Sequence, residues 1–157
     1  MQSVPVVTRK FLGYTLSTSG IFYIAKQSIK RFKDKIRAIT RRNRGIALRK
    51  VIEEINKLTP GWVRYFRKAR CRSVLEVLDG WIRRKLRCIK LKHCKRAYAI
   101  AKFLKSRGIK PRYAWQVAKS GKGWWRLALT PQAHEAMGVA WSQEEGLKSL
   151  NGIYQSL

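Results

Sequence analysis

The chain has 157 residues, and its 36 Lys and Arg against eight Asp and Glu give a formal net charge of +28. Positive charge of this size repels itself unless a polyanion neutralises it, and nucleic acid is the commonest polyanion with an extended geometry. The two aspartates, Asp34 and Asp79, lie far apart in the sequence. Because two-metal polymerases and nucleases need clustered carboxylates, the composition excludes that chemistry and favours a nucleic-acid binder.

The remaining composition is that of a folded protein. Hydrophobic residues make up 45% of the chain, and six Trp, six Tyr and five Phe can build a core. No apolar run reaches the about 18 residues of a membrane span, and no secretion signal opens the sequence. Three cysteines are an odd number, which fits a reducing compartment better than a disulfide framework. We therefore expect a cytoplasmic protein that contacts nucleic acid and no membrane.

The first patterned stretch covers residues 9–25 and is rich in β-branched and aromatic side chains. It predicts a β-hairpin whose turn is the Ser-Thr-Ser-Gly segment at 17–20. The period changes at residue 28, and apolar residues then recur every three or four positions through residue 39, with Lys and Arg between them. This spacing predicts an amphipathic helix with a cationic outer face, which ends at a basic loop over residues 41–45.

Helical spacing continues through the centre of the chain. Apolar residues at steps of three and four predict helices over residues 48–58, 73–91 and 95–106, the last of which ends at Gly108. The middle one of these helices carries a dense set of Arg and Lys around its apolar face. Charge of this density favours a binding surface on that helix.

Thr59 and Pro60 resemble a helix start more than a helix end. Thr is a good N-cap residue, and Pro fits the first turn of a helix. We therefore expect a new helix over residues 61–67, in which Trp62 and Phe66 share one face. Large aromatic residues at this spacing are usually part of a core, whereas the arginines between them are candidate phosphate contacts.

The C-terminal part is less basic and carries weaker patterns. After Pro111 we expect a short helical turn and then a loop that runs to Arg126. Thr130, followed by Pro, is an N-cap signature. Ser142 and Glu145 form an S-x-x-E capping box, which predicts the start of a final helix. The fold class is therefore mainly α, with a short N-terminal β-hairpin followed by a basic helical bundle.

Four residues offer reactive or metal-binding groups. Cys88, His93 and Cys94 could join Cys71 at a zinc ion, but their spacing matches no standard zinc finger, so we expect no metal and buried or idle thiols. An enzyme that acts through Cys71, Cys88 or His93 is the weakest alternative, because no nucleophile, base and orienting acid occur at a recognisable spacing. We expect no catalytic residue and no cofactor in this chain.

Several motifs, taken in order, resemble those of group II intron reverse transcriptases, most specifically over residues 9–91 and more loosely to residue 126. They are FLGY at 11–14, S-x-K-R-F-K-x-K-I-R-x-x-T at 28–40, R-G at 44–45, I-x-x-x-N-x-x-x-x-G-W-x-x-Y-F-R at 52–67, D-x-W-x-R-R-x-L-R at 79–87, A-W at 114–115 and K-G-W-W-R at 122–126.

The resemblance implies a division of the chain and the absence of a polymerase centre. Residues 1–26 would be the palm end with the FLGY primer grip, 27–110 the thumb or maturase-specific domain, and 111–157 the C-terminal part of the maturase region. The family's polymerase uses aspartates in a YADD-type motif, and neither that motif nor an HNH-type endonuclease pattern occurs in this sequence. The chain thus resembles a thumb and maturase unit without fingers and palm, and we expect no enzymatic activity from it.

The resemblance also implies a partner. Structured group II intron RNA would be bound to assist splicing, and in an intact enzyme the domain would grip a template–primer duplex; separate fingers and palm domains are further candidate partners. The alternative is a general DNA-binding or architectural helical protein, which would bind duplex DNA and structured RNA equally at matched salt.

The candidate nucleic-acid contacts lie in the FLGY block, the basic helices and the loops. They are Phe11, Leu12, Gly13, Tyr14, Lys30, Arg31, Arg37, Arg41, Arg42, Arg44, Arg64, Arg67, Arg83, Arg84, Arg87, Lys90, Lys119 and Lys122.

Overall fold

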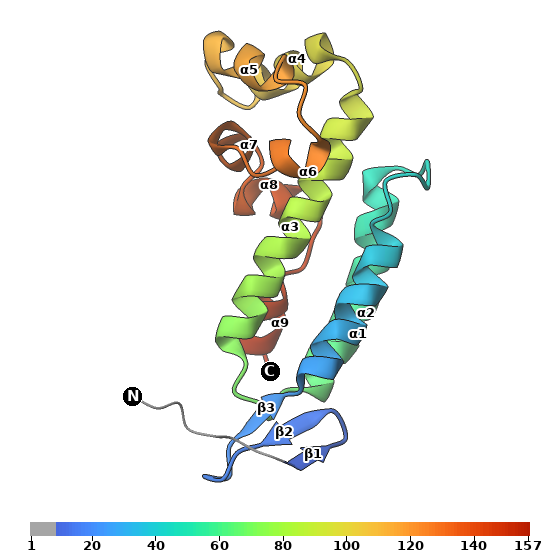
Figure 1. Cartoon of the computed structure of the whole chain (residues 1–157), viewed down its shortest axis with the longest axis vertical. Helices are drawn as coiled ribbons and strands as arrows, with labels where there is room; N and C mark the ends of the chain where they lie inside the picture. Colours follow the sequence, from blue (N-terminus) through green and yellow to red (C-terminus); the bar gives the residue numbers. More distant parts are fainter. Residues whose placement is uncertain (1–8) are drawn as a thin grey trace.

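The computed structural model describes the backbone of residues 9–157 and the side chains of residues 12–157, so the predicted contact of the Phe11 side chain lies outside the described residues. The fold is mainly α, as predicted, with a small sheet at its N-terminal end (Figure 1). The strands are β1 (Arg9–Phe11), β2 (Tyr14–Leu16) and β3 (Phe22–Ile24). The helices are α1 (Lys26–Ile39), α2 (Leu48–Tyr65), α3 (Arg72–Cys94), α4 (Ala97–Ser106), α5 (Pro111–Ala118), α6 (Trp124–Leu127), α7 (Pro131–Ala136), α8 (Val139–Glu144) and α9 (Leu150–Gln155).

The sheet is antiparallel in the order β1-β2-β3. Its β2–β3 hairpin confirms the predicted turn, because the backbone N–H of Gly20 donates to the Ser17 carbonyl at 3.0 Å. The structure adds β1, which the sequence pattern did not separate from β2. The β1–β2 turn passes through Leu12 and Gly13, both with positive φ. A Cβ on Gly13 would lie 2.8 Å from the Ser28 hydroxyl, so glycine lets the sheet dock closely on α1.

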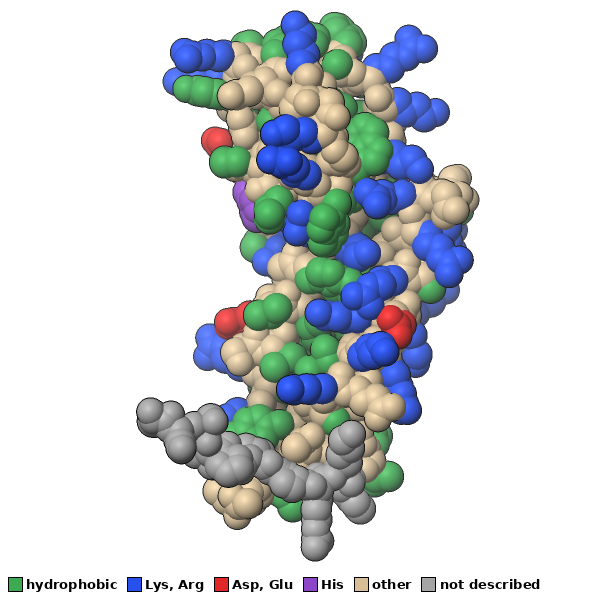
Figure 2. Space-filling model, viewed as in Figure 1, with side chains coloured by type: hydrophobic (Ala, Val, Ile, Leu, Met, Phe, Trp, Pro, Cys, Tyr) green, Lys and Arg blue, Asp and Glu red, His purple; other side chains and the backbone are tan. Residues whose placement is uncertain are grey.

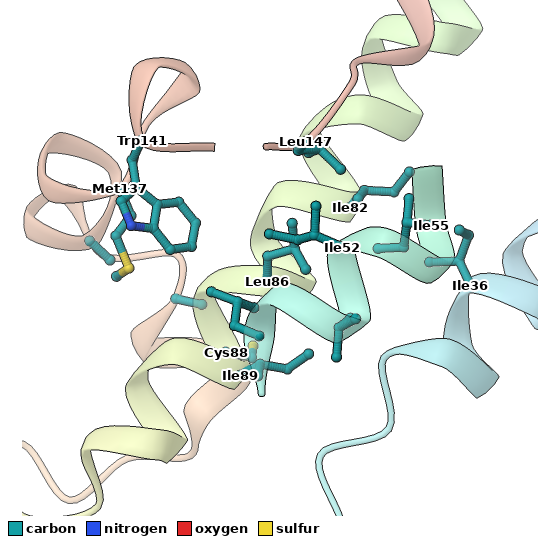
Figure 3. Close-up of a cluster of buried hydrophobic side chains, with 14 of the residues drawn as sticks. Ile36, Ile52, Ile55, Ile82, Leu86, Cys88, Ile89, Met137, Trp141 and Leu147 are labelled. Atoms are coloured by element: carbon teal, nitrogen blue, oxygen red, sulfur yellow. The ribbon is translucent and has the colours of Figure 1, made fainter. Parts of the chain in front are cut away.

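Three long helices form the body of the molecule. Helices α1 and α2 form an antiparallel hairpin beside α3, and α4 and α5 lie at the end of α3 far from the sheet (Figure 1). In the core, Ile52 and Ile55 of α2 lie close to Ile82 and Leu86 of α3 (Figure 3). Buried Trp141 belongs to the C-terminal segment, which closes the core around α3. The predicted helices of the central region are thus confirmed, and α3 is shared by most of the packing.

The predicted helix start at Thr59 and Pro60 is wrong, because α2 continues through both residues. Proline removes one backbone donor, so a bond to the Asn56 carbonyl is lost. The aromatic residues beyond Pro60 offset this loss. Trp62 stacks on Phe32 of α1 with ring centroids 4.2 Å apart, and Phe66 packs against Trp62 at 5.0 Å. This packing across the α1–α2 hairpin keeps the helix continuous.

The C-terminal elements confirm one predicted cap and correct another. The Thr130 hydroxyl accepts a hydrogen bond from the Ala133 N–H and starts α7, as expected. Ser142 does not start a helix, because it is buried inside α8 and its hydroxyl donates to the Val139 carbonyl. The last helix, α9, begins instead after Ser149, whose hydroxyl accepts from the Gly152 N–H at 2.9 Å. The expected loop after Lys119 also holds the short helix α6.

A buried carboxylate from α3 joins this last cap. Asp79 accepts hydrogen bonds from the backbone N–H groups of Leu150 at 2.7 Å and Asn151 at 3.1 Å. Burial raises the pKa of Asp79 above its ordinary value of 3.8, while the two hydrogen bonds oppose that rise. The carboxylate therefore ties α9 to the N-terminal half of α3 at the cost of burying charge.

Acidification is expected to widen the stability difference between the wild-type protein and the Asp79→Asn variant in favour of the wild type. Because its pKa is raised, folded Asp79 binds a proton more tightly than the unfolded chain does, so its contribution to stability increases as pH falls toward 3.8. Urea unfolding of both proteins at about pH 7 and about pH 4.5 measures the difference. A difference that stays constant or shrinks on acidification would contradict the assignment.

Candidate nucleic-acid interface

A concentrated basic surface surrounds Trp81, a partly exposed residue of α3. The side-chain nitrogens of Lys33 and Lys85 lie 5.3 Å and 5.2 Å from the centroid of its ring, and the Arg37 guanidinium carbon lies at 5.3 Å. Lys33 and Arg37 are one helical turn apart on α1, so they reach the same ring from across the α1–α3 interface. Figure 2 shows many basic side chains, and few acidic ones, on the face of the molecule that it presents.

A second tryptophan extends this surface toward α6. The Arg84 guanidinium lies 3.7 Å from the Trp125 ring centroid, and its Nε and Nη2 donate to the Trp125 carbonyl at 3.0 Å and 2.7 Å. Lys85 lies 5.3 Å from the same ring. We name Lys33, Arg37, Trp81, Arg84, Lys85 and Trp125 the Trp81 cluster. Its two aromatic rings, from α3 and α6, hold cations of α1 and α3 close together.

The cations of the Trp81 cluster are poorly compensated. Among the residues that the structure describes, Lys33, Arg84 and Lys85 form no ion pair, and Arg37 pairs only with exposed Asp34 of its own helix at 2.9 Å. Burial lowers the pKa of Lys85, and the positive charges of Arg37 and Arg42 lower it further. A phosphate group placed at this cluster would relieve the repulsion, because an anion favours the charged form of Lys85.

The loop between α1 and α2 continues the basic surface. Arg41 and Arg42 are exposed there, and Lys92 of α3 holds the loop by donating to the Arg42 carbonyl at 2.8 Å. Arg44 is already engaged, because it binds both carboxylate oxygens of Glu54 and donates to a backbone carbonyl. The structure thus brings Arg42, whose charge acts on Lys85, to the cluster side of the molecule, leaves Arg41 exposed on the same loop, and gives Arg44 a role in shaping the loop.

The remaining predicted contacts are distributed over the molecule. Lys30, Arg31, Arg64, Arg67, Lys119 and Lys122 are exposed, and Arg83 and Lys90 are half-buried. Lys90 lies over the Phe103 ring at 4.7 Å, which directs it toward α4. Lys119 and Lys122 follow α5, at the end of the molecule opposite the sheet (Figure 1). One continuous site of all the predicted residues therefore does not form.

The FLGY block contributes to a separate pocket. Between β2 and the end of α2 lies a pocket of about 640 Å³, lined by Leu12, Tyr14, Gly61, Arg64, Tyr65, Arg67, Lys68 and Phe22. Leu12 is exposed at its edge, whereas the Tyr14 hydroxyl donates to the Tyr65 carbonyl and its ring packs on Phe66. Gly13 serves the turn described above. This pocket combines apolar lining residues with a cationic rim of Arg64, Arg67 and Lys68.

Arg87 has a structural position instead of the predicted surface one. It is 3% exposed, its Nε donates to the Ala128 carbonyl at 2.8 Å, and its Nη1 lies 3.5 Å from the Met137 carbonyl. Burial lowers its pKa to about 10, so the guanidinium stays charged at neutral pH. Because both contacts belong to the C-terminal segment, Arg87 joins that segment to α3 and is excluded from the interface that we propose.

Of the six residues of the Trp81 cluster, only Arg37 and Arg84 were predicted as contacts; sequence reasoning missed Lys33, Trp81, Lys85 and Trp125. The available signal was the i, i+4 spacing of Lys33 with Arg37 and of Trp81 with Lys85, which places each pair on one helical face. That spacing does not show that the two faces meet. Their meeting depends on how α1 packs beside α3, and only the structure gives it.

The structure also tests the remaining expectations on the cysteines and on membrane-spanning segments. Cys88 is buried and its thiol donates to the Trp124 carbonyl at 3.4 Å, while Cys71 precedes the opposite end of α3 from Cys94. Within residues 9–157, no group of three or more His, Cys, Asp or Glu is placed to hold a metal ion. In that same part of the chain, every helix is too short or too polar to cross a bilayer.

Fold and surface together define a basic, mainly helical domain with a large excess of uncompensated cations. The sequence model of the group II intron, maturase-specific domain family matches residues 29–108, which is just over half of the 157 residues. The chain therefore belongs to the family of group II intron maturase-specific domains. The match spans α1 to α4 and confirms the resemblance seen in the sequence motifs; it concerns the maturase-specific region and not the polymerase core. No curated protein matches the chain.

Proposed function

We propose that this domain binds folded group II intron RNA through the Trp81 cluster and the neighbouring α1–α2 loop, and thereby assists splicing. The observation that carries this proposal is the cluster itself, where cations from α1 and α3 converge on two tryptophans with little carboxylate compensation. Family membership supplies the class of RNA.

The arrangement suits a folded RNA backbone. Lys33 and Lys85 would act as flexible point charges toward phosphates, while Arg37 can bind a phosphate with its planar fork. Trp81 lies between these cations and offers part of its ring to an unpaired base or a sugar. Because α1 and α3 both contribute, binding requires the packed helices and not merely a basic sequence.

A finer proposal concerns the pocket beside β2. When fingers and palm domains are supplied, Arg64, Arg67 and Lys68 on its rim would contact the backbone of a template–primer duplex. The apolar lining residues Leu12 and Tyr14 support contact with a sugar or base edge in the same place.

The proposed specificity predicts that folded intron RNA binds more tightly than an unrelated structured RNA and than duplex DNA of similar length, at every salt concentration tested. Phosphate contacts release counterions, so log affinity should fall by about 0.7 to 0.9 per contact for each unit of log salt. Four cationic contacts give a slope of about −3. Fluorescence anisotropy over a salt series measures the affinities and the slope.

The alternative function gives a different result in that experiment. Equal affinities for the three ligands that decline together with salt would identify a general DNA-binding or architectural protein. A slope near zero for intron RNA would contradict the phosphate contacts themselves.

A further inference from the structure

A second aromatic and basic surface lies on α4 and α5, at the end of the molecule opposite the sheet (Figure 1). Tyr98 of α4 and Trp115 of α5 lie side by side, with ring centroids 6.5 Å apart. The ammonium groups of Lys119 and Lys105 lie 5.2 Å and 5.8 Å from the Trp115 ring centroid. Nearby on α5, the exposed ring of Tyr113 has the Arg112 guanidinium 5.6 Å away. We name these six residues the α4–α5 patch.

Two aromatic residues of this patch, Tyr98 and Tyr113, are not explained by the core, whereas Trp115 is partly buried and packs against it with part of its ring. Helices α4 and α5 bury Ile100, Leu104, Ala114 and Val117 against the rest of the protein, whereas Tyr98 is 66% exposed. An aromatic ring that stays exposed to water gains none of the free energy of burial, so its position on the surface favours contact with a ligand.

The charge around the patch has one sign. From Gly80 to His134 the sequence contains no Asp or Glu, so neither α4 nor α5 supplies a carboxylate to its lysines. None of Lys105, Arg112 and Lys119 takes part in an ion pair within the described residues. The side chains that lie over the aromatic rings are therefore free to turn toward an anionic backbone.

The combination points to single-stranded nucleic acid. Proteins bind unpaired strands by stacking bases on aromatic side chains beside a cationic track for the phosphates. We propose that the α4–α5 patch binds unpaired nucleotides of RNA, with Trp115 and Tyr98 stacking one or two bases while Lys105 and Lys119 contact the adjoining phosphates. The choice of RNA over DNA rests on the proposed function.

This site is distinct from the Trp81 cluster. Trp81 lies 13 residues before the end of α3 at Cys94, which corresponds to about 20 Å along the helix axis, and α4 follows beyond that end. One folded RNA can therefore contact the cluster with a helical region and the patch with an unpaired segment.

The test uses two RNAs and two charge-neutral variants of the full chain. The ligands are a blunt RNA hairpin and the same hairpin with an overhang of about six unpaired nucleotides. In the Tyr98→Leu/Trp115→Leu variant, affinity for the overhang hairpin is expected to fall about 30-fold, and affinity for the blunt hairpin to stay within about twofold. The Tyr98→Phe/Trp115→Phe variant keeps aromatic faces and should retain most of the affinity. Circular dichroism monitors the folding of each variant. If the Tyr98→Leu/Trp115→Leu protein does not fold, the single variant Tyr98→Leu, at the exposed position, is tested in its place.

The outcomes separate this proposal from the proposed function. Equal losses for both hairpins, or no loss for either, would overturn the stacking site, and so would a Phe variant as weak as the Leu variant. The same loss with a DNA overhang would overturn its assignment to RNA. An Arg37→Glu/Lys85→Glu variant should lose affinity for the blunt hairpin as well as for the overhang hairpin. If its affinity for the blunt hairpin is unchanged, the Trp81 cluster fails as a binding site, and this result is independent of the Leu variant.

Discussion

Intron RNA affinity is expected to fall about 100-fold at about 0.1 M salt when Arg37 and Lys85 are both replaced by Glu. The two residues come from α1 and α3, and both side chains lie over the Trp81 ring. The change therefore removes two phosphate contacts and places repulsive charge in the centre of the cluster. The magnitude of the salt slope should decrease by about 1.5, because each lost contact contributes about 0.7 to 0.9.

A matched control separates this local effect from the loss of net charge. Lys57 and Lys148 are exposed and lie where α2 meets the C-terminal segment, since the Asn56 side chain binds the backbone of Gly146 and Lys148. Replacing both with Glu changes the net charge by the same amount. If the control loses as much affinity as the cluster variant, RNA is attracted by overall charge and the Trp81 cluster is not its site.

The Arg87→Met variant is expected to lose about 2–3 kcal/mol of unfolding free energy. Methionine fills a similar volume but leaves the Ala128 carbonyl, which lies in a buried residue, without its charged donor. The weaker contact with Met137 is lost as well. The substitution also removes the free-energy cost of burying the Arg87 charge. The expected loss of stability therefore stays below that of a broken buried ion pair.

Urea unfolding of Arg87→Met and of Arg72→Met measures this prediction. Arg72 belongs to the same helix, but its pair with Glu76 is exposed, so its replacement should change stability by no more than about 0.5 kcal/mol. At a temperature where both variants are folded, Arg87→Met should bind RNA as the wild type does. Normal stability together with weakened RNA binding would instead return Arg87 to the interface.

The parts of the fold that depend on local spacing could be predicted from the sequence. Ile29, Phe32 and Ile36 repeat at steps of three and four, and this periodicity is sufficient to define α1. Thr130 signalled the start of α7 for the same reason, because a cap is made by neighbours in sequence. The proposed division into palm end, maturase domain and C-terminal part stays a prediction.

Elements decided by distant contacts could not be predicted in this way. Thr59 and Pro60 are compatible with a helix start and with a helix interior, and the stacking of Trp62 on Phe32 selects the latter. The Trp81 cluster is a similar case, because Lys33 meets Trp81 only after α1 has packed beside α3. Arg87 resembled its basic neighbours in sequence, and the approach of the C-terminal segment removed it from the surface.

The hydrogen bonds that hold distant segments together have one further consequence. Arg84, Arg87 and Lys92 each donate to backbone carbonyls about 40 to 50 positions away and to no carboxylate. A carboxylate partner would cancel the charge of the residue that it binds, whereas a carbonyl is neutral and leaves that charge intact. At these three residues, internal cohesion and long-range attraction of a polyanion therefore do not compete: each joins distant segments and keeps its positive charge uncompensated.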